Sequence, residues 1–504
     1  MSIVSKPLAL IDEQLNRMTM YRVVLFGLLT LTAASFILSL SGMLGFTSIS
    51  LLALLGLLGI ICTPLNYALS KLFKVPFMME PTAITILILY MILPPVTSVT
   101  EGLVAILAGG IAIASKYLIT ARGRHIFNPA AFGLAAVVIA GLSSSMWWVG
   151  SMYMLPFTAL VGLLVLRKTR RFSIFATFAM VSLTILLITG IADGRSPSDI
   201  IRLAIVSGPL LFAGAIMLTE PATMPANHRY RLIFAALVGV VYAGHFSIGP
   251  VSSTPEVALL IGNLFALAVT PANRLTLRLI KKHRMSHNVY DYEFQEISGK
   301  PLAFKAGQYA EITLPLAKSD SRGNRRTFTI ASAPSEKQVH FGVRFHQPSS
   351  RFKIAFHDLE PGAIVHANHI NGDFVLPADS TKKLAFIAGG IGITPFRAHL
   401  MDLLDRGEKR DIVLLYIAST SEDISYKDVL DRARNELKIK VVPIVSNGNK
   451  TRLDTARITA ELPDYHERVF YVSGSNAMVD NTTELLTSTG VKRHHIRTDH
   501  FSGY

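Results

Sequence analysis

Ten apolar stretches fill most of the first 275 residues and constrain the fold more than any other feature of the chain. They lie near 21–42, 48–70, 81–95, 102–118, 130–149, 153–166, 172–191, 199–218, 231–247 and 255–272. Each approaches the roughly 20 residues that a helix needs to cross a bilayer. Because 50% of the 504 residues are hydrophobic and only 16% are charged, we expect a polytopic α-helical membrane domain of ten spans over residues 1–280, with the lipid bilayer as its partner.

The loops between these stretches alternate in charge. Loops after even-numbered stretches are basic, whereas loops after odd-numbered stretches carry only Arg195. The basic set is Lys71, Lys74, Lys116, Arg122, Arg124, Arg167, Lys168, Arg170, Arg171, Arg229, Arg231, Arg274, Arg278, Lys281 and Lys282. Because Lys and Arg are retained on the cytoplasmic side, this pattern predicts a multi-pass protein of the cell (inner) membrane with both termini in the cytoplasm. Some twenty polar and mixed residues precede the first stretch, so we expect an uncleaved signal anchor.

The stretches also divide into two groups of five with matching features. Stretch 3 ends in "LPPVTSVTEG" and stretch 8 in "LTEPATMPAN", which share Pro-x-Thr, and stretches 5 and 10 open with Pro129 and Pro255. Five spans per half would place the halves in opposite orientations, which predicts an inverted 5+5 repeat with broken helices at stretches 3 and 8 that meet a ligand or ion. Ordinary proline breaks would give the same spacing, and this alternative stays open.

Two motifs in this half, "HIFNPAAFGLA" and "EPATMPAN", together with the ten-span plan, resemble the flavin-carrying integral subunits of the Rnf complex and of the sodium-pumping NADH:quinone oxidoreductase, over roughly residues 15–275. In that family a Thr in an Asp-Gly-x-Ser-Gly-Ala-Thr segment carries covalent FMN. The nearest match is "DGRSPSD", residues 193–199, where Asp199 stands for that Thr. An aspartate cannot hold the phosphoester, although Ser196 or Ser198 could substitute. The resemblance therefore implies a non-covalent flavin (FMN or riboflavin) or a quinone.

Metal-based redox chemistry and nucleic-acid binding are both disfavoured. The single cysteine, Cys62, leaves no thiolate for a zinc or iron–sulfur site. The first half has only His125, His228 and His245, and two of them fall in predicted cytoplasmic loops, which argues against paired haem ligands. The net charge is +15, but its basic residues follow the loop pattern of a membrane protein rather than forming a nucleic-acid surface. We therefore expect no metal site and no nucleic acid.

The rest of the chain changes to the pattern of a water-soluble protein. Short β-rich segments separated by Gly, Pro and charged turns predict a small antiparallel β-barrel over 285–380. After Lys382, strands alternate with amphipathic helices, which predicts a doubly wound α/β domain over 381–504. The segment "IAGGIGITP" places glycines between a buried strand and a helix, where backbone N–H groups can approach a pyrophosphate. A glycine turn without a nucleotide is the alternative.

The order of "RRTFT", "GGIGITP", "SGSNAM" and a terminal aromatic resembles the FAD and NAD(P) modules of the ferredoxin–NADP reductase superfamily over about 285–504. The resemblance implies that Arg326 meets a flavin phosphate, that Phe328 packs on the cofactor and that Thr329 hydrogen-bonds the flavin near its reactive nitrogen. The residues it assigns to cofactor binding are Arg326, Thr327, Phe328, Thr329, Ser350, Gly389, Gly390, Gly392, Thr394, Pro395, Gly474 and Tyr504.

Three of the implied positions would take part in catalysis: Thr329, Ser473 and Tyr504. Ser473 stands where the family has the Cys of Cys-Gly-Pro, which removes a thiol near the nicotinamide and predicts modest rates. Tyr504 would cover the flavin face, although a frayed C-terminus is the alternative. No Arg directly follows the second strand of the α/β domain, while Arg452 could still reach a phosphate, so the sequence favours NADH slightly over NADPH.

The two halves together predict a membrane-bound FAD-dependent NAD(P)H oxidoreductase. Hydride would pass from NAD(P)H to FAD, and electrons would then enter or cross the membrane toward a quinone, a membrane flavin or an extracytoplasmic carrier. One alternative is an ion (Na⁺) transporter driven or regulated by nicotinamide redox state, since carbonyls at broken helices can bind sodium even where acidic residues lie only at span ends. A flavin reductase with a passive anchor is disfavoured, because one span would be enough to anchor it.

Overall fold

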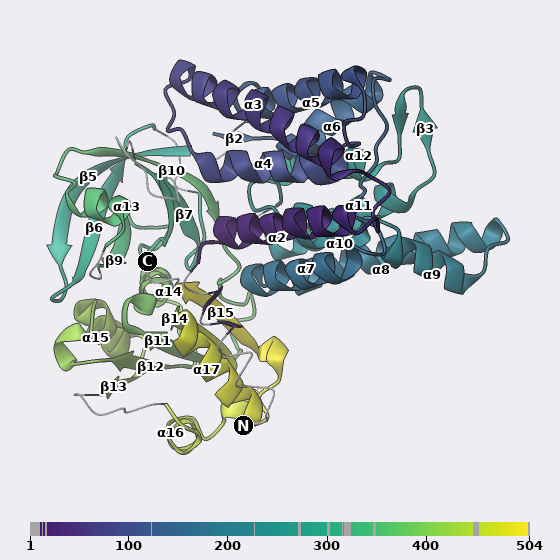
Figure 1. Ribbon diagram of the computed structural model, residues 1–504. Helices are drawn as coiled ribbons and strands as arrows, with labels where there is room; N and C mark the ends of the chain where they lie inside the picture. Colours follow the sequence, from purple (N-terminus) through teal and green to yellow (C-terminus); the bar gives the residue numbers. More distant parts are fainter. Residues whose placement is uncertain are drawn as a thin grey trace. The chain divides into compact units, whose positions relative to one another are not determined.

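The chain folds into two compact units in the computed structural model, one formed by Met1–Thr270 and the other by Pro271–Asp320 and Asn324–Tyr504. The structure describes residues 11–12, 14–15, 18–121, 123–225, 227–270, 274–299, 303–314, 316, 324–345, 349–446 and 453–501. Tyr504, Arg122 and Arg452, which figured in the predictions above, lie outside the described residues. In Figure 1 the helical unit runs from purple to teal and the parallel sheet from green to yellow.

The first unit is built almost entirely of helices. They are α2 (Met20–Leu40), α3 (Ser48–Leu72), α4 (Met79–Ile92), α5 (Val99–Leu118), α6 (Pro129–Ile139), α7 (Leu155–Thr169), α8 (Phe172–Ala192), α9 (Pro197–Val206), α10 (Leu210–Phe212), a π-helix (Ala213–Met217), α11 (His228–Ala243) and α12 (Pro255–Val269). Short hairpins are formed by β1 (Thr120–Ala121) with β2 (Arg124–His125) and by β3 (Ser247–Ile248) with β4 (Val251–Ser252). Side-chain caps begin several helices, as where Ser98 and Glu101 form a capping box at α5.

The prediction of ten membrane spans is wrong in its count. Among the described residues four helices are long and apolar enough to cross a bilayer, namely α2, α3, α5 and α8, and a fifth span results if α9 and Leu210–Met217, which are bent by 58°, are taken together. The helices α4, α6 and α12 hold 14, 11 and 15 residues. At a rise of about 1.5 Å per residue such helices are shorter than a hydrocarbon core of about 30 Å.

Burial explains why a short helix such as α4 reads as a membrane span. Every residue from Thr85 to Ile92 is buried, because α2, α3, α5 and α6 pack around this helix. A helix that is apolar on all sides is expected wherever no side meets water, in a protein core as well as in lipid. The four long helices differ from α4, because they expose large apolar side chains, such as Leu40 at 78% and Ile60 at 73%. Such surfaces indicate membrane association.

The second unit begins with a six-stranded antiparallel sheet in the order β8-β7-β10-β5-β6-β9. Its strands are β5 (Arg274–Arg284), β6 (Val289–Glu296), β7 (Tyr309–Thr313), β8 (Arg325–Thr329), β9 (Gln338–Arg344) and β10 (Ile364–Asn371), with the helix α13 (Arg351–His357) between the last two. Within the described residues the outer strands β8 and β9 are not hydrogen-bonded to each other. The sheet starts earlier than the sequence-based domain boundary, since β5 occupies Arg274–Arg284.

A five-stranded parallel sheet in the order β13-β12-β11-β14-β15 follows. Its strands are β11 (Leu384–Gly389), β12 (Ile412–Ala418), β13 (Lys440–Val445), β14 (Val469–Ser475) and β15 (Ile496–Phe501), and its main helices are α14 (Thr394–Arg406), α15 (Lys427–Glu436), α16 (Thr455–Glu461) and α17 (Asn476–Ser488). Strand order reverses between β11 and β14, which creates a topological switch point. The predicted doubly wound domain is confirmed. Ligands of such sheets bind at the carboxyl ends of the strands beside the switch point.

Candidate functional site

The predicted nicotinamide turn lies at this switch point. Gly389 ends β11, and Ala388 pairs with Ser473 of the neighbouring strand β14. A Cβ at Gly392 would lie 2.4 Å from the Ser473 carbonyl oxygen, so only glycine fits there. Gly390 has φ +53°, in the left-handed region that favours glycine. The glycines therefore let the turn close tightly against β14.

The turn leads directly into α14, whose first two residues are Thr394 and Pro395. The Thr394 hydroxyl donates to the Ile391 carbonyl at 3.1 Å, and the Tyr416 hydroxyl donates to the Gly390 carbonyl at 3.1 Å. Burial raises the pKa of Tyr416 to about 12, so its hydroxyl stays a neutral donor. These bonds fix the turn that leads into α14, and the start of a helix favours the negative charge of a pyrophosphate.

Ser473 is fully buried, and its Oγ has no hydrogen-bond partner among the described residues. Buried hydroxyls are nearly always paired in folded proteins, so an orphaned one beside a glycine turn indicates a group completed by a ligand. Gly474 follows it, with the Gly389 Cα 3.4 Å from the position of a Gly474 Cβ. The structure thus brings together Gly389, Gly392, Ser473 and Gly474, as the sequence predicted. The donor set fits a nicotinamide dinucleotide.

The predicted flavin strand is β8. Thr329 is buried at 6% exposure and pairs with Tyr309 of β7, whereas Thr327 is exposed. The ring of Phe328 stacks on Phe356 with centroids 5.2 Å apart and on Phe352 at 6.0 Å. The Phe328 ring therefore packs against the aromatic core of the sheet. The sequence had predicted only that it packs on the cofactor.

The predicted phosphate-binding residues lie close together. The guanidinium carbon of Arg326 is 5.1 Å from the centre of the Phe352 ring, in the first turn of α13. Ser350 caps that helix, and its Oγ accepts from the Lys353 N–H at 3.2 Å. A guanidinium beside a capped helix start provides N–H donors and positive charge, which fits the diphosphate of FAD.

Two residues of this region were not predicted from the sequence. Arg344 of β9 extends toward the glycine turn, with one guanidinium nitrogen 3.0 Å from the position of a Gly390 Cβ. Asp499 of β15 pairs in register with Ser473, and burial raises the pKa of this carboxyl to about 6. Arg344 belongs to no local motif, and Asp499, which opens the closing segment "DHFSGY", was not singled out within it, so the pairing of strands places both residues here.

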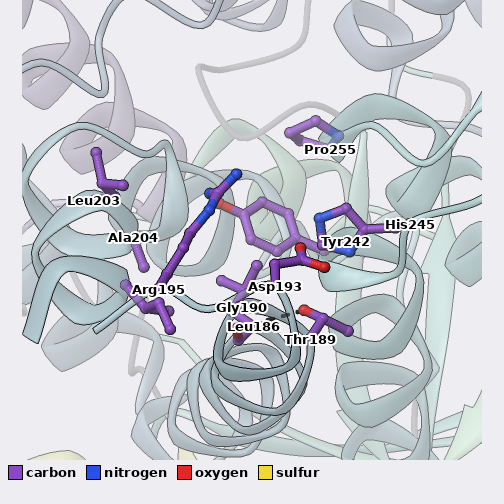
Figure 2. A pocket seen from close by; sticks show the side chains of 11 residues that line it. Leu186, Thr189, Gly190, Asp193, Arg195, Leu203, Ala204, Tyr242, His245 and Pro255 are labelled. Carbon is purple, nitrogen blue, oxygen red and sulfur yellow. Dashed lines mark hydrogen bonds between the residues drawn. The ribbon is translucent and has the colours of Figure 1, made fainter. Parts of the chain in front are cut away.

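The helical unit contains a separate pocket between α8, α9, α11 and α12, with a volume of about 300 Å³. Figure 2 shows the side chains that line it. Its apolar lining includes Leu186, Ile200, Leu203 and Ala204, and its polar lining includes Asp193, Arg195, Tyr242 and His245. These four polar side chains make no hydrogen bond or ion pair within the residues that the structure describes.

The "DGRSPSD" segment forms one edge of this pocket. Asp193 caps the end of α8, and Ser196 caps the start of α9, where its Oγ accepts from the Asp199 N–H at 3.2 Å. The Ser196 hydroxyl also donates to the Asp199 carboxylate at 2.7 Å and lies 3.0 Å from the Ser198 Oγ. The hydroxyl of the alternative attachment point Ser196 is therefore engaged in capping the start of α9.

The two motifs that carried the resemblance of the first half meet in space. The Asn128 amide donates to the Glu220 carboxylate at 2.8 Å, and the Thr223 hydroxyl donates to the same oxygen at 3.2 Å. Asn263 of α12 joins them, because its side chain accepts from the Asn128 N–H at 2.9 Å and donates to the Thr223 carbonyl at 3.0 Å. His125 lies 3.5 Å from Glu220. Asn263 was missed because it sits within an apolar run.

Known proteins match the second unit of the chain. Residues 386–484 match the family model of the oxidoreductase NAD-binding domain. The chain is 28% identical over 242 residues to ferredoxin–NADP reductase B of Sorangium cellulosum, which covers 44% of this chain and 96% of that protein. It is 25% identical over 240 residues to a flavohemoprotein of Bacillus cereus, which covers 44% of this chain but only 60% of that protein.

Solved structures give a consistent but weaker likeness. The cytochrome P450 reductase GcoB of Amycolatopsis matches with a TM-score of 0.41 at 22% identity, over 45% of this chain and 70% of that one. A flavohemoglobin from Malassezia yamatoensis matches with a TM-score of 0.44 at 20% identity, over 69% of this chain and 98% of that one. Scores below 0.5 support no further conclusion.

None of these matches identifies the helical unit as a subunit of the Rnf complex or of a sodium-pumping oxidoreductase. The second unit gives a consistent picture. Its family match, the order of its two sheets and the glycine turn at the switch point all indicate an oxidoreductase module. The second unit is similar to oxidoreductase modules of the ferredoxin–NADP reductase type, and its parallel sheet carries the match to the NAD-binding domain.

Proposed function

We propose that the whole chain is a membrane-bound NAD(P)H:acceptor oxidoreductase whose acceptor binds in the helical unit. The observation that carries this proposal is the meeting of the glycine turn with Ser473 at the switch point, in the same unit as the strand that bears Arg326 and Thr329. NAD(P)H would bind at 389–395 and give up a hydride, which is two electrons and one proton. With one further proton from water, the two electrons would reduce the acceptor and release NAD(P)⁺.

The chain's own residues would fix the cofactors for this transfer. Arg326 would pair with the FAD diphosphate, and Thr329 would donate a hydrogen bond to the ring edge that receives the hydride. When bound, FAD supplies the exchange between hydride transfer and single-electron transfer. Tyr504 would cover the flavin face with its flat aromatic ring, and Thr327 of β8 would contact the cofactor.

The pocket between α8, α9, α11 and α12 is the best candidate binding site for the acceptor. Its volume of about 300 Å³ falls at the lower end of the usual range for ligand sites. An apolar wall with Tyr242, Arg195 and His245 as donors suits a ring with oxygen acceptors, such as a non-covalent flavin (FMN or riboflavin) or a quinone. The large apolar side chains that the four long helices expose support a cell-membrane location. The proposal places both termini and the FAD module in the cytoplasm.

The proposal has a direct test in the purified full-length protein. The protein should be yellow, with FAD released on denaturation, and NADH or NADPH should bleach the flavin absorbance without oxygen. Added soluble quinone should then restore the absorbance at a rate that falls when Arg195 is replaced by Ala. A colourless protein, or a flavin that nicotinamide does not reduce, would refute the oxidoreductase. If Arg195→Ala left the rate of flavin reoxidation by quinone unchanged, only the proposed acceptor site in this pocket would be refuted.

A further inference from the structure

A buried polar cluster joins the antiparallel sheet to the parallel-sheet domain within the second unit. Its members are Asp291 of β6, Glu336 and His340 of the β8–β9 region, Arg397 of α14 and Tyr426 before α15, and we call it the junction cluster. The Asp291 carboxylate is 5% exposed and receives a hydrogen bond from the Tyr426 hydroxyl at 2.8 Å. Its other oxygen lies 2.7 Å from the His340 Nδ1. Neither domain can complete this cluster alone.

Arg397 makes the second connection across the junction. Its guanidinium forms a bidentate pair with the Glu336 carboxylate at 2.5 and 2.8 Å, and it donates to the Ala331 carbonyl at 3.0 Å. Its guanidinium carbon also lies 5.7 Å from the centre of the Tyr426 ring. Bidentate, buried pairs of this kind hold a fixed geometry, which exposed ion pairs do not.

The connection made by Arg397 joins segments that lie beside the flavin strand and the nicotinamide turn. Ala331 lies two residues after Thr329 of the flavin strand, and Arg397 lies three residues after Thr394 of the nicotinamide turn. The strand β9 touches the same turn, because a Cβ at Gly342 would lie 2.6 Å from both the Thr394 Cγ2 and the Tyr426 hydroxyl. The junction cluster therefore links the segment after the flavin strand to the helix after the nicotinamide turn through hydrogen bonds and an ion pair.

The backbone at Tyr426 also favours a positioning role. This residue has φ +57° and ψ +40°, a left-handed conformation that is unfavourable for residues other than glycine. It is 4% exposed, and its hydroxyl reaches Asp291 from this conformation. A left-handed, buried tyrosine is retained where its surroundings hold it in place, here across the junction between the two domains.

We propose that the junction cluster is a positioning site for hydride transfer, which sets the separation between the flavin strand and the nicotinamide turn. The inference rests on the proposed reduction of FAD by NAD(P)H. Hydride transfer depends steeply on the distance and angle between donor and acceptor, so a small loosening of the junction should slow the chemical step more than it weakens binding. Tyr426, Asp291 and Arg397 act through the geometry of the site and not by contact with the reacting atoms.

The test is Tyr426→Phe in the full-length protein, which removes one hydroxyl and leaves the ring beneath Arg397. Anaerobic stopped-flow reduction with NADH and with NADH deuterated at the transferred position should show a limiting rate lowered about 5- to 10-fold, the effect of one lost hydrogen bond. The primary isotope effect should rise, while flavin content and the dissociation constant for NADH stay within about 2-fold. Gly342→Ala, which pushes β9 away from the turn, should act in the same direction.

The matched control is Tyr465→Phe. The Tyr465 hydroxyl is a donor in the parallel-sheet domain, 3.4 Å from the Thr489 carbonyl, and the Tyr465 ring packs against the core of that sheet. Its removal should therefore leave the limiting rate and isotope effect unchanged. A Tyr426→Phe protein that keeps the wild-type rate and isotope effect, with or without a lower melting temperature, would overturn the positioning role. A wild-type flavin that NADH does not reduce would instead refute the proposed function.

Discussion

Ser473 combines two properties that rarely occur together, complete burial and a hydroxyl without a partner. In Ser473→Ala the buried orphan oxygen is removed, so the melting temperature should stay equal or rise. Loss of this side-chain donor beside the turn should raise the KM for NADH about 5-fold, close to 1 kcal/mol, with kcat less affected. Steady-state kinetics and thermal unfolding of the same preparations measure both effects.

Ser475 offers a control two residues away. Its Oγ caps α17 and accepts from the Met478 N–H at 3.4 Å. Ser475→Ala should therefore lower stability by about 1 kcal/mol and leave the KM for NADH unchanged, the opposite outcome. If Ser473→Ala behaved like Ser475→Ala, the orphaned hydroxyl would not face the nucleotide.

At this scale, short motifs pointed to residues that the structure brings together where those residues are neighbours in sequence. Gly389, Gly392 and Thr394 follow each other along one turn, and their roles depend on backbone shape. Tyr426 and Asp291 gave no comparable pattern, because 135 residues separate them and their hydrogen bond exists only after both domains have folded. Arg344 and Asp499 were missed for the same reason.

Among the helices, length was harder to predict than position. A helix lies at each apolar stretch, yet α4 and α6, with 14 and 11 residues, are too short for a span. Hydropathy reports only that a segment avoids water, and the interior of a helical bundle satisfies this as well as lipid does. The shared Pro-x-Thr ends predicted broken helices at stretches 3 and 8. Stretch 8 is bent by 58° between α9 and Leu210–Met217, whereas stretch 3 forms the single continuous helix α4. The inverted repeat stays a prediction.

The helix α14 makes a further prediction through His399. Its ring is buried, with Nε2 2.9 Å from the Phe374 carbonyl, and burial lowers its pKa to about 3. The unfolded chain binds a proton near pH 6.5 and the folded one does not, so stability should fall as pH drops through that value. Between pH 7 and pH 5 this group alone should remove about 2 kcal/mol.

His399→Gln separates this effect from the rest of the chain. Gln keeps an N–H donor for Phe374 but does not titrate, so the loss of stability between pH 7 and pH 5 should shrink by about 2 kcal/mol. Denaturant unfolding of the flavin-carrying unit at the two pH values measures it. The same change at His466, which is exposed, serves as the control. An undiminished pH difference in His399→Gln would mean that other groups carry it.

For the whole molecule, the joint between the units differs most from the sequence-based picture. The basic segment at 275–284 looks like a linker that holds the last helix in place, yet it forms β5, which lies between β10 and β6 in the antiparallel sheet. α12 ends at Val269, so few residues separate helix and strand. Strand pairing across the sheet with β10, near residue 364, is a long-range property that a local change in composition could not show.

The basic residues of this joint predict on which side of the membrane the second unit lies. If the basic loops face the cytoplasm, the FAD module does so as well. NADH does not cross bilayers, so sealed inside-out vesicles should oxidise added NADH, whereas right-side-out vesicles should do so only after permeabilisation. Activity in sealed right-side-out vesicles would place the module outside and contradict the charge-based orientation.

The same vesicles also test whether the helical unit couples electron flow to the movement of sodium ions. The bent pair of α9 and Leu210–Met217 interrupts a helix within the apolar unit, and such breaks can present carbonyl oxygens to a cation. An oxidoreductase without coupled transport should oxidise NADH at the same rate in potassium and in sodium buffers. It should also load no sodium into inside-out vesicles. NADH-dependent sodium uptake that an ionophore collapses would assign ion transport to the helical unit and would leave the flavin chemistry of the second unit intact.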